Sequence, residues 1–217
     1  MNYSQNFLVD KDVIRKISDN ISTERPLIEI GCGKGNLSEV VSPDLCIEID
    51  QRLLSFLKNY NPIQGDARKL PVLRGQIISS LPYSITYDFF MEIIKINGIS
   101  RLLLILQEDF VNKVIDYPTF ISFILNYYFE INKLFVIPPS SFRPAPRIFS
   151  ALVSLKRSRQ YDQKVTDVIA CISKYRNKSL NNIAKLCGLN SSSDKRLRDF
   201  KPWMVIDILA TLGISYA

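Results

Sequence analysis

Glycine and acidic residues stand at the ends of two predicted strands, where they could hold a nucleoside. The first group is Glu29–Gly35 (EIGCGKG), whose glycines let the backbone approach a ligand closely. In the second group, Ile47–Asp50, Glu48 stands 17 residues after Gly31, where a carboxylate can accept both hydroxyls of a ribose. Each group also has an ordinary interpretation, a tight strand-to-helix turn for the glycines and a solvated acid for Glu48.

A third motif of this kind, Gly65–Ala67, follows a predicted strand over 62–64. Asp66 could accept a hydrogen bond from an adenine amine, or it could form only an Asx turn. Three such strand ends in consecutive units rarely arise by accident, so together they predict an adenosine pocket. Because the phosphate-binding pattern G-x-G-x-x-G is absent, S-adenosylmethionine fits this pocket better than NAD does.

The fourth predicted strand ends in Ser79–Tyr83 (SSLPY), which could orient an amine for reaction. An adenine amine is a poor nucleophile, so a catalyst must hold it with acceptors and aim it at the sulfonium methyl group. The Leu81 carbonyl and the Ser80 side chain could accept those bonds, while Tyr83 would stack on the base. This chemistry requires no strong general base. A proline turn beside a core tyrosine is the alternative interpretation.

The composition is that of a globular protein and excludes several classes of function. Hydrophobic residues make up 47% and charged residues 23%, and the longest aliphatic run, Leu102–Leu106, is far too short for a membrane span. Met1–Gln5 lacks the regions of a signal peptide, so we expect a cytoplasmic protein.

The absence of histidine excludes Ser-His hydrolysis and most catalytic zinc sites, and we expect no metal. The four cysteines form no C-x-x-C pair, which predicts free thiols in a reducing compartment: Cys32, Cys46, Cys171 and Cys187.

The hydrophobic pattern predicts alternating strands and helices followed by a helical end. After a helix over 10–21, predicted strands alternate with helix-length segments such as 51–59, which is typical of a parallel sheet covered on both faces. The predicted strands are 27–30, 45–49, 62–64, 77–80 and 102–106. Two further strands, 134–137 and 149–155, flank a proline-rich loop and predict a closing hairpin. Beyond the polar stretch 156–160 the pattern is helical, with helices near 165–172, over 179–186 and from Pro202 onward.

Positive charge is concentrated in the C-terminal third of the chain. Residues 1–142 hold 14 Lys and Arg against 16 Asp and Glu, whereas residues 143–217 hold 14 against 5. The overall charge of +7 therefore resides in the C-terminal part. This asymmetry favours a polyanionic partner such as nucleic acid, with a solubilising surface as the alternative.

Taken in order, these motifs strongly resemble those of the ribosomal RNA adenine dimethyltransferases, a family related to the erythromycin-resistance rRNA methyltransferases. The resemblance spans about 5–157 and continues weakly through Tyr175–Leu180 and Asp194–Arg196. Its segments are Gln5–Leu8, Glu29–Gly35, Ile47–Asp50, Gly65–Ala67, Ser80–Tyr83, Gln107–Glu108 and Phe142–Arg147. It implies an α/β, Rossmann-like class I methyltransferase with a mostly parallel seven-stranded sheet. An S-adenosylmethionine-binding catalytic domain would occupy 1–157, and a small basic helical domain 158–217.

The family's activity implies a substrate, a cofactor and a partner. The resemblance implies N6-dimethylation of two adjacent adenosines near the 3′ end of small-subunit ribosomal RNA, with S-adenosylmethionine as cofactor. The expected partner is the small ribosomal subunit assembly particle, and we expect a monomer that binds no membrane. By the family's pattern, Asn6 and Leu8 close over the methionine part of the cofactor and Gly31 lies beneath it. Glu48 holds the ribose, and Asp66 holds the adenine.

On the target side, the resemblance assigns the base and its amine to three residues. Ser80 contacts the cofactor or the target amine, and Tyr83 with Phe142 sandwiches the base. The family's usual asparagine is here Ser80, whose shorter hydroxyl can still accept a hydrogen bond. Basic residues downstream are expected to contact RNA phosphates: Arg143, Arg147, Lys156, Arg157 and Arg159.

Two other functions compete with this prediction. A catalytically weakened ribosome-assembly binding factor on the same fold is favoured by Ser80 and by a chain shorter than we expect for the family. A small-molecule methyltransferase is favoured only by the glycine loop, and the basic C-terminal part argues against it. The aromatic stretch Phe110–Phe129 has helical spacing, which favours core packing over a base-stacking surface.

Overall fold

The computed structural model describes residues 6–214, and the chain divides into two compact units. The first unit contains the residues up to 111 together with 132–157, and the second contains 112–131 together with the residues from 158 onward. The predicted division at residue 157 differs from this in one segment, 112–131. That segment carries α5 (Phe120–Tyr128), which buries seven of its nine residues and packs on α6 and α8 of the second unit. Gln5, the first residue of the predicted motifs, lies outside the described residues.

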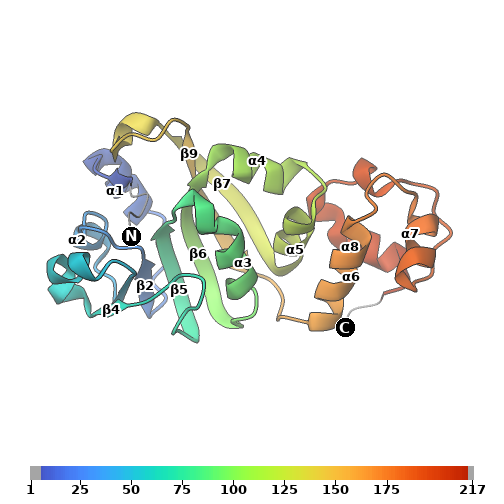
Figure 1. Ribbon diagram of the computed structural model, residues 1–217, viewed down its shortest axis with the longest axis horizontal. Helices are drawn as coiled ribbons and strands as arrows, with labels where there is room; N and C mark the ends of the chain where they lie inside the picture. Colours follow the sequence, from blue (N-terminus) through green and yellow to red (C-terminus); the bar gives the residue numbers. More distant parts are fainter. Residues whose placement is uncertain (1–5, 215–217) are drawn as a thin grey trace. The chain divides into compact units, whose positions relative to one another are not determined.

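A seven-stranded sheet organises the first unit, and its strands lie side by side in Figure 1. The strand order is β4 (Pro62–Gln64), β3 (Leu45–Glu48), β2 (Leu27–Ile30), β5 (Arg74–Ser80), β6 (Gly98–Gln107), β9 (Ser150–Arg157) and β7 (Phe129–Ile137). The strands from β4 to β6 are parallel, and β9 runs antiparallel to β6. The predicted mostly parallel sheet of seven strands is therefore confirmed. All four residues of β2 are buried, as expected for a strand covered on both faces.

Short helices connect the strands of this sheet. They are α1 (Lys11–Ser18), α2 (Ser38–Val41), α3 (Thr86–Ile93) and α4 (Glu108–Asp116), with the 3₁₀ helices η1 (Gln51–Tyr60), η2 (Tyr83–Ile85) and η3 (Pro139–Ser141). The predicted opening helix is present, and the Asp10 side chain caps it by accepting from the amides of Asp12 and Val13. The predicted helix over 51–59 is present as η1, a 3₁₀ helix capped by Asp50.

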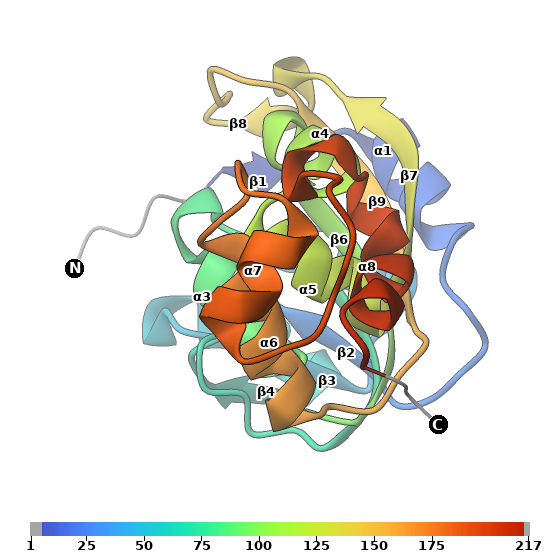
Figure 2. The ribbon, with the colours of Figure 1, turned by 90° about the vertical axis from the view of Figure 1, so that its right-hand side faces the viewer.

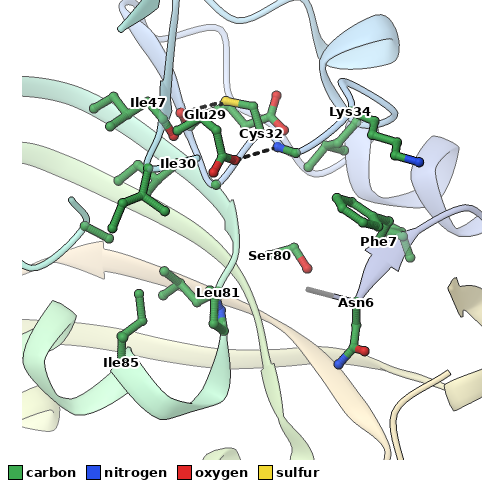
Figure 3. A pocket seen from close by; sticks show the side chains of 18 of the residues that line it. Asn6, Phe7, Glu29, Ile30, Cys32, Lys34, Ile47, Ser80, Leu81 and Ile85 are labelled. Atoms are coloured by element: carbon green, nitrogen blue, oxygen red, sulfur yellow. Dashed lines mark hydrogen bonds between the residues drawn. The ribbon is translucent and has the colours of Figure 1, made fainter. Parts of the chain in front are cut away.

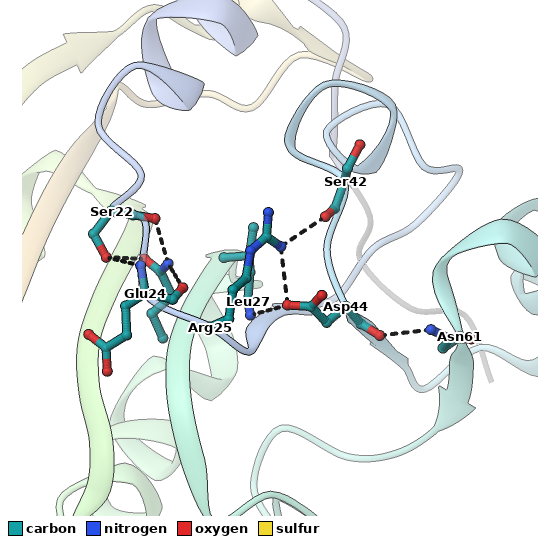
Figure 4. Close-up of polar contacts among 8 residues, drawn as sticks. Ser22, Glu24, Arg25, Leu27, Ser42, Asp44 and Asn61 are labelled. Atoms are coloured by element: carbon teal, nitrogen blue, oxygen red, sulfur yellow. Dashed lines mark hydrogen bonds and ion pairs between the residues drawn. The ribbon is translucent and has the colours of Figure 1, made fainter.

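Polar contacts fix the amino ends of the central strands (Figure 4). The Asp44 carboxylate accepts from the Leu27 amide at 2.7 Å and from the Arg25 guanidinium at 3.1 Å. The Asn61 side chain donates to the Asp44 carbonyl at 3.0 Å. The Leu27 amide, and after it the Arg25 guanidinium, lower the pKa of Asp44. This edge of the sheet is therefore occupied by structural contacts, and the opposite, carboxyl edge carries the predicted site.

The second unit is helical (Figure 2). With α5 it contains α6 (Gln163–Ser173), α7 (Leu180–Cys187) and α8 (Val205–Thr211), and the 3₁₀ helices η4 (Leu197–Asp199) and η5 (Pro202–Met204). Helix α7 ends as predicted at Gly188, which has φ +68°. The aromatic stretch packs mainly in the core as predicted, because Phe123, Tyr127 and Tyr128 are buried, although Tyr117 is 62% exposed.

A disulfide between Cys171 of α6 and Cys187 of α7 corrects the prediction of four free thiols. The two Cα atoms lie 6.0 Å apart although the cysteines are 16 positions apart in sequence. A search for closely spaced cysteine pairs misses such a bond, because only the packing of α6 on α7 brings the two residues together. Cys32 and Cys46 are free and buried. None of the helices between residues 6 and 214 has the length and apolarity needed to cross a bilayer.

Candidate active site

The carboxyl ends of β2, β3, β4 and β5 border a cavity of about 550 Å³. In open α/β sheets this edge binds ligands where the strand order reverses, which here is between β2 and β5. The cavity is lined by all nine residues that the sequence assigned to cofactor and target: Asn6, Leu8, Gly31, Glu48, Asp66, Ser80, Leu81, Tyr83 and Phe142. The structure thus brings them together around one space, and their individual roles remain predictions.

The glycine loop after β2 exposes backbone to this cavity. Gly31 has φ +72°, and a Cβ built on it meets only the Ser80 carbonyl, at 3.9 Å. Gly33 has φ +58°, and a Cβ there would lie 2.9 Å from the Phe7 ring. Both positions require glycine for their backbone conformation, and Gly33 requires it also for space.

Gly33→Ala is expected to lower the unfolding free energy by at least about 1–2 kcal/mol, the cost of a left-handed backbone for an L-residue. Because the methyl group must also displace Phe7, the affinity for S-adenosylmethionine should fall. Chemical denaturation and calorimetric titration measure the two effects. Gly188→Ala is the matched control, since Gly188 has φ +68° and a Cβ added to it would meet no atom within 4 Å. Equal loss of cofactor affinity in both variants would contradict the steric argument.

Glu48 is the last residue of β3, and its carboxylate binds the glycine loop and the backbone of Asp50. Its Oε2 accepts from the Gly33 amide at 2.8 Å, and its Oε1 accepts from the Asp50 amide at 2.9 Å. The residue is only 3% exposed. Each carboxylate oxygen retains a further lone pair, so the carboxylate can hold the loop and still accept from a ribose.

Asp66 forms an Asx turn and also faces the cavity, so both alternatives that the sequence left open are compatible with its position. Its carboxylate accepts from the Arg68 amide at 2.9 Å, which is an Asx turn, and it also lines the cavity. The Arg68 guanidinium donates to both oxygens, at 3.0 Å from Nε and 2.7 Å from Nη2. This contact is the main reason that the pKa of Asp66 is lowered. Arg68 itself lines the cavity, and sequence analysis did not predict it.

Glu29 is a second cavity residue to which the sequence gave no role. It is 2% exposed in the middle of β2, and its Oε2 accepts from the Ser38 hydroxyl at 2.7 Å. Burial raises the pKa of Glu29 well above its ordinary value of 4.5. One of its carboxylate oxygens and the sulfurs of Cys32 and Cys46 lie within 4.8 Å of one another. An acid inside an otherwise apolar strand was the signal available in the sequence.

The raised pKa of Glu29 predicts a pH-dependent stability. The folded protein holds this proton to higher pH than the unfolded chain, so the contribution of Glu29 to the unfolding free energy decreases as pH rises above 4.5. Glu29→Gln keeps an acceptor for Ser38 and removes the titration. We expect its stability relative to the wild type to increase between pH 5 and pH 8, as followed by urea denaturation. Glu39→Gln, at an exposed acid on α2, should show no such trend.

Ser80 is the last residue of β5, and Leu81 and Tyr83 follow it. Figure 3 shows Ser80 in the middle of the cavity, with Ile30 and Ile85 on one side and Asn6 and Phe7 on the other. Tyr83 begins η2, is half-buried, and places its hydroxyl 2.7 Å from the Ser150 hydroxyl. The polar and aromatic groups predicted to receive the target amine and its base therefore lie next to the predicted cofactor residues.

The N-terminal strand β1 (Phe7–Leu8) pairs with β8 (Phe142–Arg143). This pairing joins a segment predicted to close over the cofactor to a segment predicted to contact the target base. Leu8 lies opposite Phe142 in this antiparallel pair, and the Asn36 side chain donates to the Leu8 carbonyl at 2.8 Å. Phe142 lines the cavity but is only 2% exposed, because it packs in a core cluster with Leu8. Phe142 therefore offers little exposed surface for a stacked base.

The structure corrects one of the expected RNA contacts. The Arg157 guanidinium donates to the carbonyls of Ile93, Ile94 and Ile96, at the end of α3 and in the following turn, and to that of Ile99 in β6. Its donors thus bind the backbone where α3 ends and β6 begins, which is a structural role. Arg159 similarly donates to the Tyr127 carbonyl at 3.2 Å and lies over the Tyr127 ring.

Comparison with known protein families gives matches over most of the chain. The model of a family described as ribosomal RNA adenine dimethylase matches residues 1–183. A protein from Listeria welshimeri named ribosomal RNA small subunit methyltransferase A is 31% identical over 194 residues, covering 75% of this chain and 66% of the relative. A protein of the same name from Malacoplasma penetrans is 28% identical over 206 residues, covering 82% and 75%. The match to the Listeria protein thus spans slightly less than two thirds of that relative's length.

Two solved structures share the fold. A dimethyladenosine transferase from Plasmodium falciparum has a TM-score of 0.78 at 17% identity, covering 95% of this chain and 97% of that chain. The 23S rRNA methyltransferase ErmE has a TM-score of 0.73 at 18% identity, covering 96% and 100%. These likenesses confirm the Rossmann-like fold class predicted from the sequence.

Proposed function

Because the chain belongs to the ribosomal RNA adenine dimethylase family, we propose that it methylates adenosine amines of ribosomal RNA with S-adenosylmethionine. The finer form of the proposal is N6-dimethylation of two adjacent adenosines near the 3′ end of small-subunit RNA. One observation carries it: the nine residues predicted for cofactor and target line a single cavity. The names of the curated relatives support the same enzyme class and the same RNA.

The residues that line the cavity fit S-adenosylmethionine in polarity. The carboxylates of Glu48 and Asp66 supply acceptors for the donors of an adenosine, its ribose hydroxyls and its amine. Ile30 and Ile47 offer apolar surface for the purine, and the exposed backbone beside Gly31 suits the methionine part. When bound, the cofactor supplies an electrophilic methyl group on a positively charged sulfur.

The residues after β5 would orient the target amine. The Leu81 carbonyl and the Ser80 hydroxyl accept hydrogen bonds from the amine, which favours a nitrogen whose lone pair points at the methyl carbon. An N–C bond forms as the C–S bond breaks, and the amine proton passes to solvent. No side chain needs to act as a strong base, in keeping with a chain that contains no histidine.

The second unit offers a place for RNA phosphates. A cavity of about 480 Å³ there is lined by the start of α5, including Thr119 and Phe120, and by the basic side chains of Lys174, Arg176 and Lys178. Lys and Arg side chains that surround a cleft are the groups that neutralise phosphates. We include in the proposal a monomer that acts in the cytoplasm on a small-subunit assembly particle, where protein and RNA together shape the target loop.

The test is to incubate the protein with labelled S-adenosylmethionine and unmethylated small ribosomal subunits, then to digest the RNA and identify its modified nucleosides. The proposal expects dimethyladenosine among these nucleosides, and sequencing of the labelled RNA fragments should place it at two adjacent positions. A failure to methylate, despite measurable binding of cofactor and particle, would reject it for this substrate.

A binding factor with weakened catalysis is the second candidate, and Ser80 is the observation that favours it. Ser80 takes the place of the asparagine usual in the resembling family, so its side chain offers one hydroxyl instead of an amide. If the wild type binds particles without methylating them and Ser80→Asn creates activity, the binding-factor function is supported. Methylation by the wild type would instead support the proposed enzymatic function.

A further inference from the structure

The hydroxyl of Tyr83 contacts a residue that lies outside the cavity and outside every motif of the sequence. The Tyr83 Oη and the Ser150 Oγ are 2.7 Å apart, although the two residues are 67 positions apart in the chain. Ser150 does not line the cavity and has no exposed surface. It therefore contacts, at the hydroxyl end, the ring that is proposed to receive the target base.

Ser150 is held rigidly by the sheet. It is the first residue of β9 and lies opposite Gln107 of β6, in an antiparallel pairing that continues along both strands. The next residue back, Phe149, accepts a hydrogen bond through its carbonyl from the Glu108 amide at 3.1 Å. Tyr83, in contrast, begins a three-residue 3₁₀ helix on a loop. The contact therefore ties a residue of a short turn to the most regular part of the fold.

This contact fixes the direction of the Tyr83 ring. The ring is attached at one end to the backbone of η2 and at the other end, through its hydroxyl, to β9. A displacement of about 1 Å in a group that orients a reactant can reduce a rate about 100-fold, so the direction of a stacking surface matters for the amine beyond it. We propose that Ser150 is a positioning residue, which acts through Tyr83 to place the target adenine. The proposal rests on the proposed function of the cavity.

The test is a double-mutant cycle of Ser150→Ala and Tyr83→Phe, measured as methylation of small subunits and as affinity for adenosine monophosphate. Each variant removes one side of a single hydrogen bond, so each should lower kcat/KM for the RNA by about 3- to 10-fold. The double variant should be no worse than either single variant, because both remove the same interaction. Affinity for S-adenosylmethionine should remain close to that of the wild type.

Ser154→Ala is the matched control, since Ser154 lies on the same strand in a half-buried position. It should leave activity unchanged. Additive losses in the cycle, or losses that follow cofactor affinity, would overturn the positioning role. Binding of adenosine monophosphate distinguishes a failure of the positioning role from a failure of the proposed function. It is followed through the ring protons of the nucleotide by NMR, with S-adenosylhomocysteine present. If the wild type binds the nucleotide but does not methylate RNA, the proposed function is refuted. The effect of the cycle on nucleotide affinity then still tests the role of Ser150. A wild type that binds no nucleotide and methylates no RNA overturns both.

Discussion

Replacement of Glu48 by alanine is expected to lower the affinity for S-adenosylmethionine by at least about 100-fold. The carboxylate accepts from the amides of Gly33 and Asp50 in a site that is only 3% exposed. Its loss leaves two buried N–H groups without these partners, at a cost of about 1–3 kcal/mol each, and also removes the proposed ribose contacts. Calorimetric titration with the cofactor measures the change directly.

Two further variants make this prediction specific. Glu39→Ala removes an exposed acid of α2 and should bind the cofactor as the wild type does. Glu48→Gln keeps the shape and one acceptor oxygen, so its affinity should lie between those of the wild type and Glu48→Ala. If Glu48→Ala binds the cofactor normally while remaining folded, the ribose is held elsewhere.

Tyr83→Ala is expected to reduce methylation of small ribosomal subunits by about 10- to 100-fold, since stacking of a base on an aromatic ring contributes about 1–3 kcal/mol. The affinity for S-adenosylmethionine should change little, because the proposed ribose and adenine contacts come from Glu48 and Asp66. Initial rates with labelled cofactor, together with a separate cofactor titration, distinguish the two quantities.

Tyr87→Ala is the control for this prediction. Tyr87 lies four positions further along the chain, on α3, and is 48% exposed. Its removal should leave the methylation rate unchanged. A fall in cofactor affinity as large as the fall in rate would instead assign Tyr83 to the cofactor pocket.

The parts of the fold that depend on local patterns were predictable from the sequence. The apolar strand Leu27–Ile30 was predicted with its observed bounds, because parallel strands buried on both faces form short continuous apolar runs. The clustering of the site also followed from local information. Glu48, Asp66 and Ser80 each stand at or just after the carboxyl end of a parallel strand, and these ends meet at one edge of the sheet.

Features that depend on contacts between distant segments could not be predicted in this way. The disulfide of Cys171 requires the packing of α6 on α7, and the contact of Ser150 with Tyr83 requires β9 to lie beside β6. Arg157 looked like a surface cation because its sequence neighbours are polar, yet α3, the turn after it and the start of β6 supply four carbonyls as its partners. Likewise the burial of Phe142 follows from pairing with a strand at the other end of the sequence.

The interleaving of the two units has a consequence for dissecting the protein. The chain passes between the units at three places, after residues 111, 131 and 157, so no single cut separates them. A fragment that ends at residue 157 would keep α5 but lose α6 and α8, against which α5 packs. Its buried aromatic and aliphatic side chains would then face water and favour aggregation. The two units are therefore expected to fold only when they are expressed as one chain.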